Sequence, residues 1–502
     1  MKRAASAAFC LFLAMLFPFF ARGQGRFTEY DFSVKGDIND VITEDLNGDG
    51  LKELIAIHTD TSTTPPTRFI TIFWQGQSGF DVKNKYMWRV PPEVAATDVG
   101  DVAAEPGREL VFITEKGIYY AGTAGGKVGE LKQIFKTQSV VAIAYDRSVP
   151  YYNFVRDYTG DGKDDILVCG FYDALVARQV DGYQFVRDEI QLRPGMEIMA
   201  FDMHFMTGSQ EHPLFRVAYY VPRVFSEDAN GDGLVDLIAN FRNEVYVFAQ
   251  GPEGFIAAPA KHYSIKIYEE EPSGRRQGQF PNIEFADLDG DRKMDMVASQ
   301  MKGDFGNMQS KTYLYLGKSD GAAKNKPDLV FNTVKPAFGV YIHDVNKDGL
   351  LDLVMPTFDI NLWNTGKVLV TGDITVEWDY FVQKKDRSFS ADPDRVVPTN
   401  LKFNIGKFRL ESGIPNVFGD FNGDGYPDQA LGESKDVLVI TLRDGLGNVL
   451  PISERITVPV SIITRAADLN NDGLSDLEIH YMEDPEHASE LRVFINKGPW
   501  NQ

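Results

Sequence analysis

Seven segments of this chain repeat one nine-residue pattern of oxygen-bearing side chains. Positions 1 and 5 are aspartate, position 3 is asparagine, aspartate or, once, threonine, and position 9 is always a carboxylate. The first copy reads Asp45-Leu-Asn-Gly-Asp-Gly-Leu-Lys-Glu53. A tightly turning backbone points alternate side chains inward, so this spacing could surround one hard cation with oxygen atoms.

Calcium fits this donor set best, because Ca²⁺ takes roughly six to eight oxygen ligands, whereas Mg²⁺ demands a stricter octahedron. Position 6 is glycine in six copies, and position 7 varies, as expected if only its carbonyl is used. We therefore predict about seven calcium sites that mainly stabilise turns. The predicted ligand residues, copy by copy, are Asp45, Asn47, Asp49, Leu51 and Glu53; Asp157, Thr159, Asp161, Lys163 and Asp165; Asp228, Asn230, Asp232, Leu234 and Asp236; Asp287, Asp289, Asp291, Lys293 and Asp295; Asp344, Asn346, Asp348, Leu350 and Asp352; Asp420, Asn422, Asp424, Tyr426 and Asp428; and Asp468, Asn470, Asp472, Leu474 and Asp476.

The residues after each copy exclude an EF-hand. An EF-hand needs a glutamate at position 12, and position 12 is apolar in every copy here. A short apolar run such as Leu54–Ile57 follows each copy and is typical of a strand. The loop therefore joins two strands. Such turns also suit hairpins without metal, but seven copies in register favour metal binding.

Two segments depart from the pattern. In the copy at Asp287, Arg292 replaces the turn glycine. An eighth copy that begins at Asp98 has lost the alternation and gained residues, and we expect it to keep its hairpin and bind no ion. Whether the Asp98 and Asp287 loops bind metal stays open at this point.

The spacing of the copies predicts the architecture. The first aspartates, including Asp98, lie 48 to 76 residues apart, and repeats of this kind, rich in short strands, indicate propeller blades. We predict an all-β β-propeller with four-stranded antiparallel blades in a single domain, residues 24–502, with long excursions at about 186–218 and 357–410. The segment Gly25–Val34 resembles a strand that the last unit lacks, and pairing of the two would close the ring; the alternative is a frayed terminus.

These loops between strands, with trailing Gly-Phe elements, resemble the FG-GAP/VCBS repeats of integrin-alpha-type β-propellers. The resemblance covers essentially the whole chain after the leader, and implies one ion per intact loop on one face of the ring. Integrin-like rings have seven blades, but eight units occur here, so we expect eight blades, with seven plus a partial unit as the alternative. Members of this family serve adhesion, carbohydrate binding and, in some cases, polysaccharide cleavage, so the fold does not decide the function.

The net charge of the chain and its N-terminal residues indicate what kinds of partner it has and where it is located. The formal net charge is −21, and 23 of the carboxylates lie in the seven loops, so acidity follows the metal pattern and argues against nucleic-acid binding. Residues 1–23 read as a signal peptide, with a retained membrane anchor as the alternative. We therefore expect an exported protein, secreted, periplasmic or on the cell surface, without a stable membrane span after cleavage. Only Cys169 would then remain, as a buried apolar residue.

No catalytic residues emerge, because zinc-protease, nucleophile-elbow and phosphate-loop motifs are absent from the sequence. We expect a scaffold that binds a protein or glycan ligand rather than an enzyme. The alternative is an extracellular polysaccharide lyase or hydrolase that uses the central pocket of the ring.

The two excursions could carry binding groups, or each could be a strand pair on its own blade. A weaker idea is a soft-metal or redox role for the first, and the aromatic set of the second could stack on a sugar or anchor a protein partner. The residues concerned are Met196, Met199, Met203, His204, Met206 and His212 in the first and Trp363, Trp378, Tyr380, Phe381, Lys384, Lys385 and Arg387 in the second.

Overall fold

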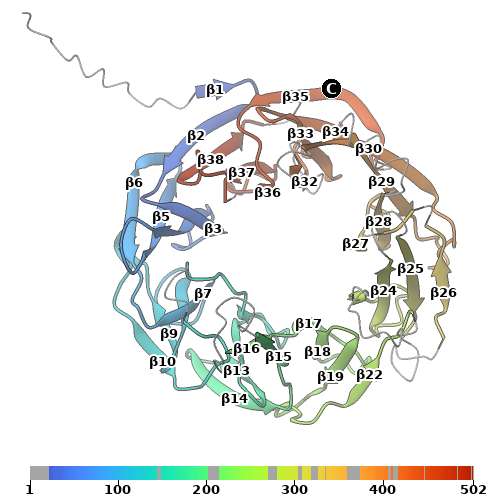
Figure 1. Ribbon diagram of the computed structural model, residues 1–502, viewed down its shortest axis with the longest axis horizontal. Coiled ribbons are helices and arrows are strands. Elements are labelled where there is room, and N and C mark those ends of the chain that lie inside the picture. Colours follow the sequence, from blue (N-terminus) through green and yellow to red (C-terminus); the bar gives the residue numbers. More distant parts are fainter. Residues whose placement is uncertain are drawn as a thin grey trace, which may run out of the picture.

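The computed structural model shows eight four-stranded antiparallel β-sheets arranged as blades around a ring (Figure 1). The described residues are 22–143, 148–201, 214–268, 280–303, 308–317, 326–358, 373–404, 409–410 and 417–500, apart from 334, 338, 446, 483 and 499. Within them there is no α-helix, only a 3₁₀ turn, η1 (Ala124–Gly126). The prediction of an all-β, eight-bladed propeller is confirmed, and the seven-bladed alternative is wrong.

We number the blades from 1 to 8 and give their strands from the centre of the ring outward. Blade 1 is β3 (Asp37–Glu44), β4 (Glu53–Asp60), β5 (Thr67–Gly76) and β6 (Gly79–Arg89); blade 2 is β7 (Val94–Gly100), β8 (Glu109–Thr114), β9 (Gly117–Ala121) and β10 (Lys132–Phe135); blade 3 is β11 (Val155–Arg156), β12 (Asp165–Cys169), β13 (Ala174–Val180) and β14 (Gln184–Ile190); blade 4 is β17 (Arg223–Glu227), β18 (Asp236–Phe241), β19 (Glu244–Phe248) and β22 (Lys261–Ser264). A short hairpin, β20 (Gln250–Gly251) with β21 (Gly254–Phe255), interrupts blade 4.

The second half of the ring repeats this order. Blade 5 is β23 (Asn282–Ala286), β24 (Asp295–Lys302), β25 (Gln309–Tyr315) and β26 (Leu329–Phe331); blade 6 is β27 (Tyr341–His343), β28 (Asp352–Phe358), β29 (Asp373–Phe381) and β30 (Arg395–Asn404), extended by β31 (Arg409–Leu410); blade 7 is β32 (Val417–Gly419), β33 (Asp428–Ser434), β34 (Val437–Arg443) and β35 (Val449–Thr457); blade 8 is β36 (Ile463–Ala467), β37 (Asp476–His480), β38 (Glu490–Asn496) and β2 (Phe27–Ser33).

Blade 8 is assembled from both ends of the described chain. Strand β2 pairs antiparallel with β38, in a register that runs from Phe27 opposite Asn496 to Ser33 opposite Glu490. The short strand β1 (Arg22–Gln24) pairs with the outer edge of β2. Figure 1 shows the blue β2 beside the red β38.

The second strand of each blade explains why the sequence reads as short apolar runs. All residues of β4, β12 and β37 are buried, because a neighbouring blade packs on each face of these sheets. Outer strands such as β35 alternate exposed and half-buried residues instead. The hydrophobic cores therefore lie between blades; one joins Ile55 of blade 1 to Phe112 of blade 2.

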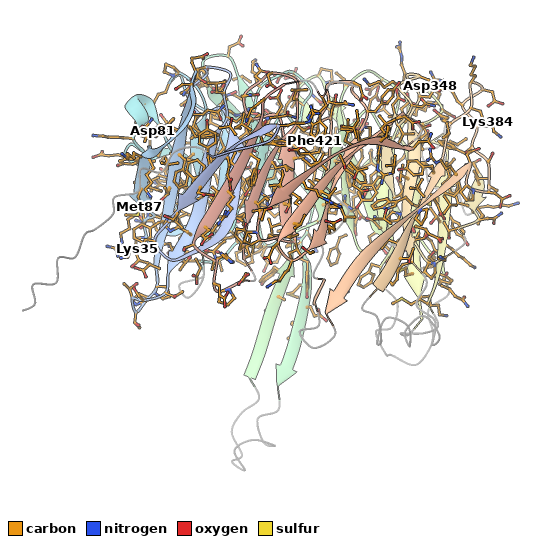
Figure 2. The ribbon with its side chains drawn as sticks, turned by 90° about the horizontal axis from the view of Figure 1, so that it is seen from above. Lys35, Asp81, Met87, Asp348, Lys384 and Phe421 are labelled. Atoms are coloured by element: carbon orange, nitrogen blue, oxygen red, sulfur yellow. The ribbon has the colours of Figure 1, made fainter. Side chains whose placement is uncertain are left out.

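The first excursion contains a two-stranded hairpin, β15 (Gly195–Phe201) with β16 (Leu214–Tyr220), which belongs to no blade. Figure 2 shows it as the green pair of strands projecting from one face of the ring. Met196 on β15 is 60% exposed. Met203, His204, Met206 and His212 lie outside the described residues, as does the side chain of Met199.

The second excursion is largely regular blade structure. Strands β29 and β30 are the third and fourth strands of blade 6. Trp378 is 3% exposed and packs against Val354 and Val397, and Phe381 is fully buried. The expectation that these two aromatic residues stack on a sugar is therefore wrong, because they fill the cores between blades. Trp363 lies outside the described residues.

Candidate metal centres

Every predicted metal loop connects the innermost strand of a blade to its second strand. Because the innermost strands run in the same direction around the ring, these loops lie on the same face. Figure 2 shows Asp348, from the loop of blade 6, at the face opposite the β15–β16 hairpin. The loops therefore form a circular array on one face of the propeller.

Backbone conformation organises each loop around its first aspartate. In blade 1, Gly48 and Gly50 both adopt positive φ, at 76° and 86°, which glycine does without strain. Their N–H groups donate to the two oxygens of Asp45, at 2.7 and 2.8 Å. Asn47 Oδ1 accepts a hydrogen bond from the N–H of Asp49 at 2.9 Å. The side chains at positions 1, 3 and 5 are thus fixed on one side of the turn.

The same contact recurs in all seven intact copies. The position-6 N–H donates to Oδ2 of the position-1 aspartate at 2.5–3.0 Å throughout. This holds even for the copy at Asp287, where Arg292 adopts a φ of 64° and donates at 3.0 Å. The replacement of glycine by Arg292 therefore leaves the turn intact.

The Asp287 copy also shows the tightest group of acids. Oxygens of Asp287, Asp289 and Asp295 lie within 4.8 Å of one another, the one such group of three metal-binding side chains among the described residues. The other copies carry asparagine or threonine at position 3, so their donor sets combine acids with a neutral oxygen. All-oxygen sets of this kind fit Ca²⁺, which would be held by positions 1, 3, 5, 7 and 9 and would supply positive charge to the turn.

The acid at position 9 is completely buried in every intact copy. One of its oxygens accepts the N–H of position 2 at 2.7–3.2 Å. In six copies the other oxygen accepts an N–H from the end of the third strand, at 2.6–2.9 Å. We call this arrangement the position-9 clamp, because it fastens the loop to the sheet.

Burial raises the pKa values of these clamp carboxyls. The pKa of Glu53 rises to about 7, that of Asp236 to about 6 and that of Asp476 to about 7, because desolvation penalises the charged form. Hydrogen bonds from backbone N–H groups oppose the shift, and nearby loop acids add to it. A divalent cation beside the clamp would favour its ionised form.

An amide side chain at the end of the third strand links neighbouring loops, a feature that the sequence analysis missed. The N–H of Asn496 donates to its own clamp residue, Asp476, at 2.7 Å, while its Nδ2 donates to the carbonyl of Phe421 in the loop of blade 7 at 2.8 Å. Gln75 reaches the carbonyl of Leu469 in the same way, at 3.2 Å. The signal that could have revealed these residues is an amide recurring where the third strand ends, at Gln75, Gln179, Gln250, Gln383 and Asn496.

The eighth copy begins at Asp101, not Asp98, which corrects the predicted register. Glu109 is its buried clamp residue and accepts the N–H groups of Val102 and Ala103 at 2.9 and 3.1 Å. Counting back from Glu109 gives nine residues with no insertion. We call residues 101–109 the broken loop.

Asp98 itself lies inside β7 and is buried. Its carboxylate accepts the N–H groups of Phe154 and Val155 in blade 3, at 2.6 and 2.7 Å. Asp98 therefore joins two blades instead of beginning a loop.

A cavity of about 420 Å³ lies among the inner strands β17, β23 and β27, where the enzyme hypothesis would place a reaction. Its walls include Phe225, Tyr341 and one acid, Glu284. Glu284 is ion-paired with Arg223 at 3.2 Å. Paired carboxylates of the kind used in glycoside hydrolysis do not line this cavity in the described part of the chain.

Residues 287–355 match the family model described as FG-GAP-like repeat, and they include the loops of blades 5 and 6. The propeller thus contains an FG-GAP-like repeat in this segment, in agreement with the resemblance. No curated protein matches the chain. No helix in the described part of the chain is long and apolar enough to cross a membrane.

Several solved structures are similar to this chain at low sequence identity. An Agrocybe aegerita lectin that recognises non-reducing terminal N-acetylglucosamine is 15% identical, covering 74% of this chain and 90% of its own, with a TM-score of 0.39. The V. cholerae biofilm matrix protein Bap1 is 13% identical, covering 93% and 90%, with a TM-score of 0.39. The Dos1 propeller is 10% identical, covering 93% and 95%, with a TM-score of 0.43. We infer nothing about function from these likenesses.

Proposed function

We propose that this protein is a secreted or cell-surface propeller, stabilised by about seven calcium ions, that serves as a binding scaffold for a protein or glycan ligand. The observation that carries the proposal is the array of seven loops, each with a position-1 carboxylate held by backbone N–H groups and a buried position-9 clamp. Three or four acids crowd each loop, and their mutual repulsion is relieved by a cation.

Export supports this assignment. Extracellular modules bind calcium with dissociation constants of roughly 10⁻⁴–10⁻³ M, which suits ions that stay bound outside the cell. The leader-like residues 1–23 are consistent with that location. A rigid ring with cavities between its strands then offers fixed surfaces to a ligand.

Calcium content and thermal stability test the structural half of the proposal. Purified residues 24–502 should contain about seven calcium ions by elemental analysis, and EGTA should lower Tm by many degrees. At a free calcium concentration a hundred times Kd, each site contributes about 2.7 kcal/mol to the free energy of unfolding. Substitution of the exposed acid Asp81 by Asn, outside the loops, serves as a control that leaves the ion count unchanged. An identical melt with and without EGTA would refute the proposal.

Binding screens test the functional half. The calcium-loaded protein should retain specific glycans or proteins on arrays, and the EGTA-treated protein should lose them as the ring loosens. A calcium-loaded protein that binds nothing on either type of array would leave the ring without the scaffold role proposed here.

A further inference from the structure

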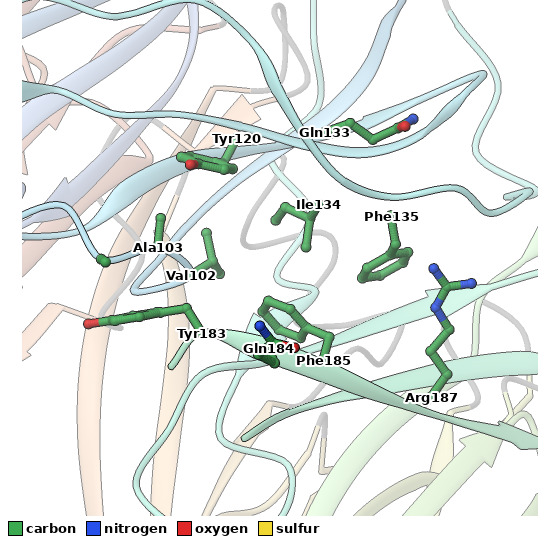
Figure 3. A pocket seen from close by; sticks show the side chains of 11 residues that line it. Val102, Ala103, Tyr120, Gln133, Ile134, Phe135, Tyr183, Gln184, Phe185 and Arg187 are labelled. Carbon is green, nitrogen blue, oxygen red and sulfur yellow. The ribbon is translucent and has the colours of Figure 1, made fainter. Parts of the chain in front are cut away.

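A cavity of about 380 Å³ lies between blades 2 and 3, beside the broken loop (Figure 3). Its walls come from β9 and β10 of blade 2 and from β14 of blade 3. A volume of this size falls within the range of roughly 300–1,000 Å³ that small-molecule sites occupy.

The loss of ligand side chains from the broken loop shapes this cavity. Positions 3 and 4 are Ala103 and Ala104, and their small apolar side chains form part of the cavity lining. Position 6 is Pro106, which has no N–H to donate to the position-1 residue, Asp101. Burial raises the pKa of the Asp101 carboxyl above its usual value, and the nearby Tyr183 side chain from blade 3, the smaller effect, acts to lower that pKa. The aspartate at position 1 therefore lies beside an aromatic side chain here.

Two tyrosine rings face the cavity. Figure 3 shows Tyr120 and Tyr183 on opposite sides, with Val102 and Ala103 between them. Tyr183 adopts a φ of 57° and its side chain stays exposed, an arrangement that a bulky residue adopts only when its surroundings hold it. The Nζ of Lys132 lies 5.4 Å from the centre of the Tyr120 ring. Such rings offer flat apolar faces and a polar edge.

The charge of the cavity is opposite to that of the chain. Arg187 is the one charged residue in its described lining, whereas the whole chain carries −21. Its guanidinium lies 4.9 Å from the centre of the Phe135 ring, and its Nη1 donates to the carbonyl of Lys136 at 3.5 Å. Gln133 and Gln184 add amide groups to the lining. An anion that also presents hydroxyl groups matches this set.

We propose that this cavity binds an acidic sugar of a polysaccharide, with its ring against the side chains of Tyr120 or Tyr183 and its carboxylate on Arg187. A pyranose has an apolar C–H face for the aromatic rings and hydroxyl groups for the amides, and the planar guanidinium matches a carboxylate. The inference rests on the proposed scaffold function and assigns it a site and a ligand class.

Calorimetry with defined oligosaccharides tests the site. The probes are tetrasaccharides of galacturonate, of mannuronate and of hyaluronan, the methyl ester of the galacturonate tetrasaccharide, and a sulfated neutral tetrasaccharide. We expect at least one uronate to bind the calcium-loaded protein and the ester and sulfated probes to bind at least tenfold more weakly. Arg187→Gln should weaken uronate binding roughly tenfold or more, because a charge-assisted hydrogen bond is lost. Tyr183→Asn removes the ring but tolerates the positive φ, and should weaken it as well.

Arg455→Gln, an exposed arginine in blade 7, is the matched control and should bind like the unaltered protein. Equal binding of uronate and ester, a preference for the sulfated probe, or full binding by Arg187→Gln would overturn the inference. So would capture of a peptide that depends on Arg187, which would assign the cavity to a protein partner. Failure of every uronate in a protein that holds calcium and binds another ligand sinks this inference alone; failure to hold calcium sinks the proposed function.

Discussion

The loop of blade 1 and the broken loop of blade 2 are neighbours in the ring. Comparing them distinguishes the structural role of the nine-residue motif from its proposed role in binding a cation. Both keep the hairpin and a buried acid at position 9, Glu53 or Glu109, that accepts N–H groups from its own loop. They differ at positions 3 and 6, where the broken loop has Ala103 and Pro106. The clamp therefore belongs to the sheet architecture, while positions 1, 3 and 5 are the side chains that the proposed cation would require.

The largest effect should come from removing a clamp. Asp476→Ala and Glu109→Ala each leave buried N–H groups without an acceptor, so each should lower the free energy of unfolding by about 3 kcal/mol. Urea denaturation measures this loss. Calcium content should fall by one ion in Asp476→Ala and stay unchanged in Glu109→Ala. Equal losses of calcium in the two variants would contradict the division of roles.

Substitution of the position-1 aspartate should also affect the two loops differently. Asp45→Ala should remove one calcium ion and destabilise the protein by about 2 kcal/mol in calcium, with a smaller difference in EGTA. Asp101→Ala in the broken loop should leave the ion count unchanged, because that loop lacks the oxygen donor at position 3. Elemental analysis measures the number of bound ions, and thermal melts in calcium and in EGTA measure the change in stability. A calcium-dependent stability change in Asp101→Ala would mean that the broken loop holds an ion.

The broken loop also predicts a pH dependence. Burial raises the pKa of Glu109 to about 7, above its ordinary value of 4.5. The folded protein then binds a proton that the unfolded chain releases, so this stability term is complete below pH 4.5 and is lost as the pH rises through 7. Melts in EGTA at pH 5.5 and 8.0 should show a smaller pH effect in Glu109→Gln than in the unaltered protein. An equal change in Tm between pH 5.5 and pH 8.0 in both proteins would contradict the predicted contribution of Glu109.

The smallest effect should come from the turn of blade 5. Arg292 adopts a φ of 64°, where glycine pays no steric cost, so Arg292→Gly should stabilise the protein by about 0.5–1 kcal/mol. Gly233→Ala at the same position of blade 4, with a φ of 88°, should destabilise it by a similar amount. Denaturation curves compare the two. A stabilised Gly233→Ala would show that the backbone argument is wrong.

Much of the architecture could be read from the sequence because the repeat is local. Each loop and its following strand lie within a few residues of each other, so Asp45 and Leu54 predict a turn and a buried strand together. Eight such units gave eight blades. The placement of Asp98 failed because an aspartate in a buried strand resembles a loop start until its partners, Phe154 and Val155, are known.

The remaining features depend on contacts between distant segments. The sequence left Trp378 either at a binding surface or in a strand pair on its own blade, and the packing of blade 7 against blade 6 buries it. The links from Gln75 and Asn496 to neighbouring loops join residues hundreds of positions apart or in different blades. The cavity beside the broken loop likewise needs two blades, since Tyr120 and Tyr183 meet only after the sheets pack.

The pairing of β2 with β38 sets an order on synthesis. Contacts such as Arg492 with Glu29 span 463 residues, so β2 has no pairing partner of blade 8 until β38 has been synthesised. Seven blades have all their strands before β38 is synthesised, but the ring stays open at one edge until β38 pairs with β2. Translation time, rather than the folding of any single blade, therefore determines how long that edge is exposed to other chains.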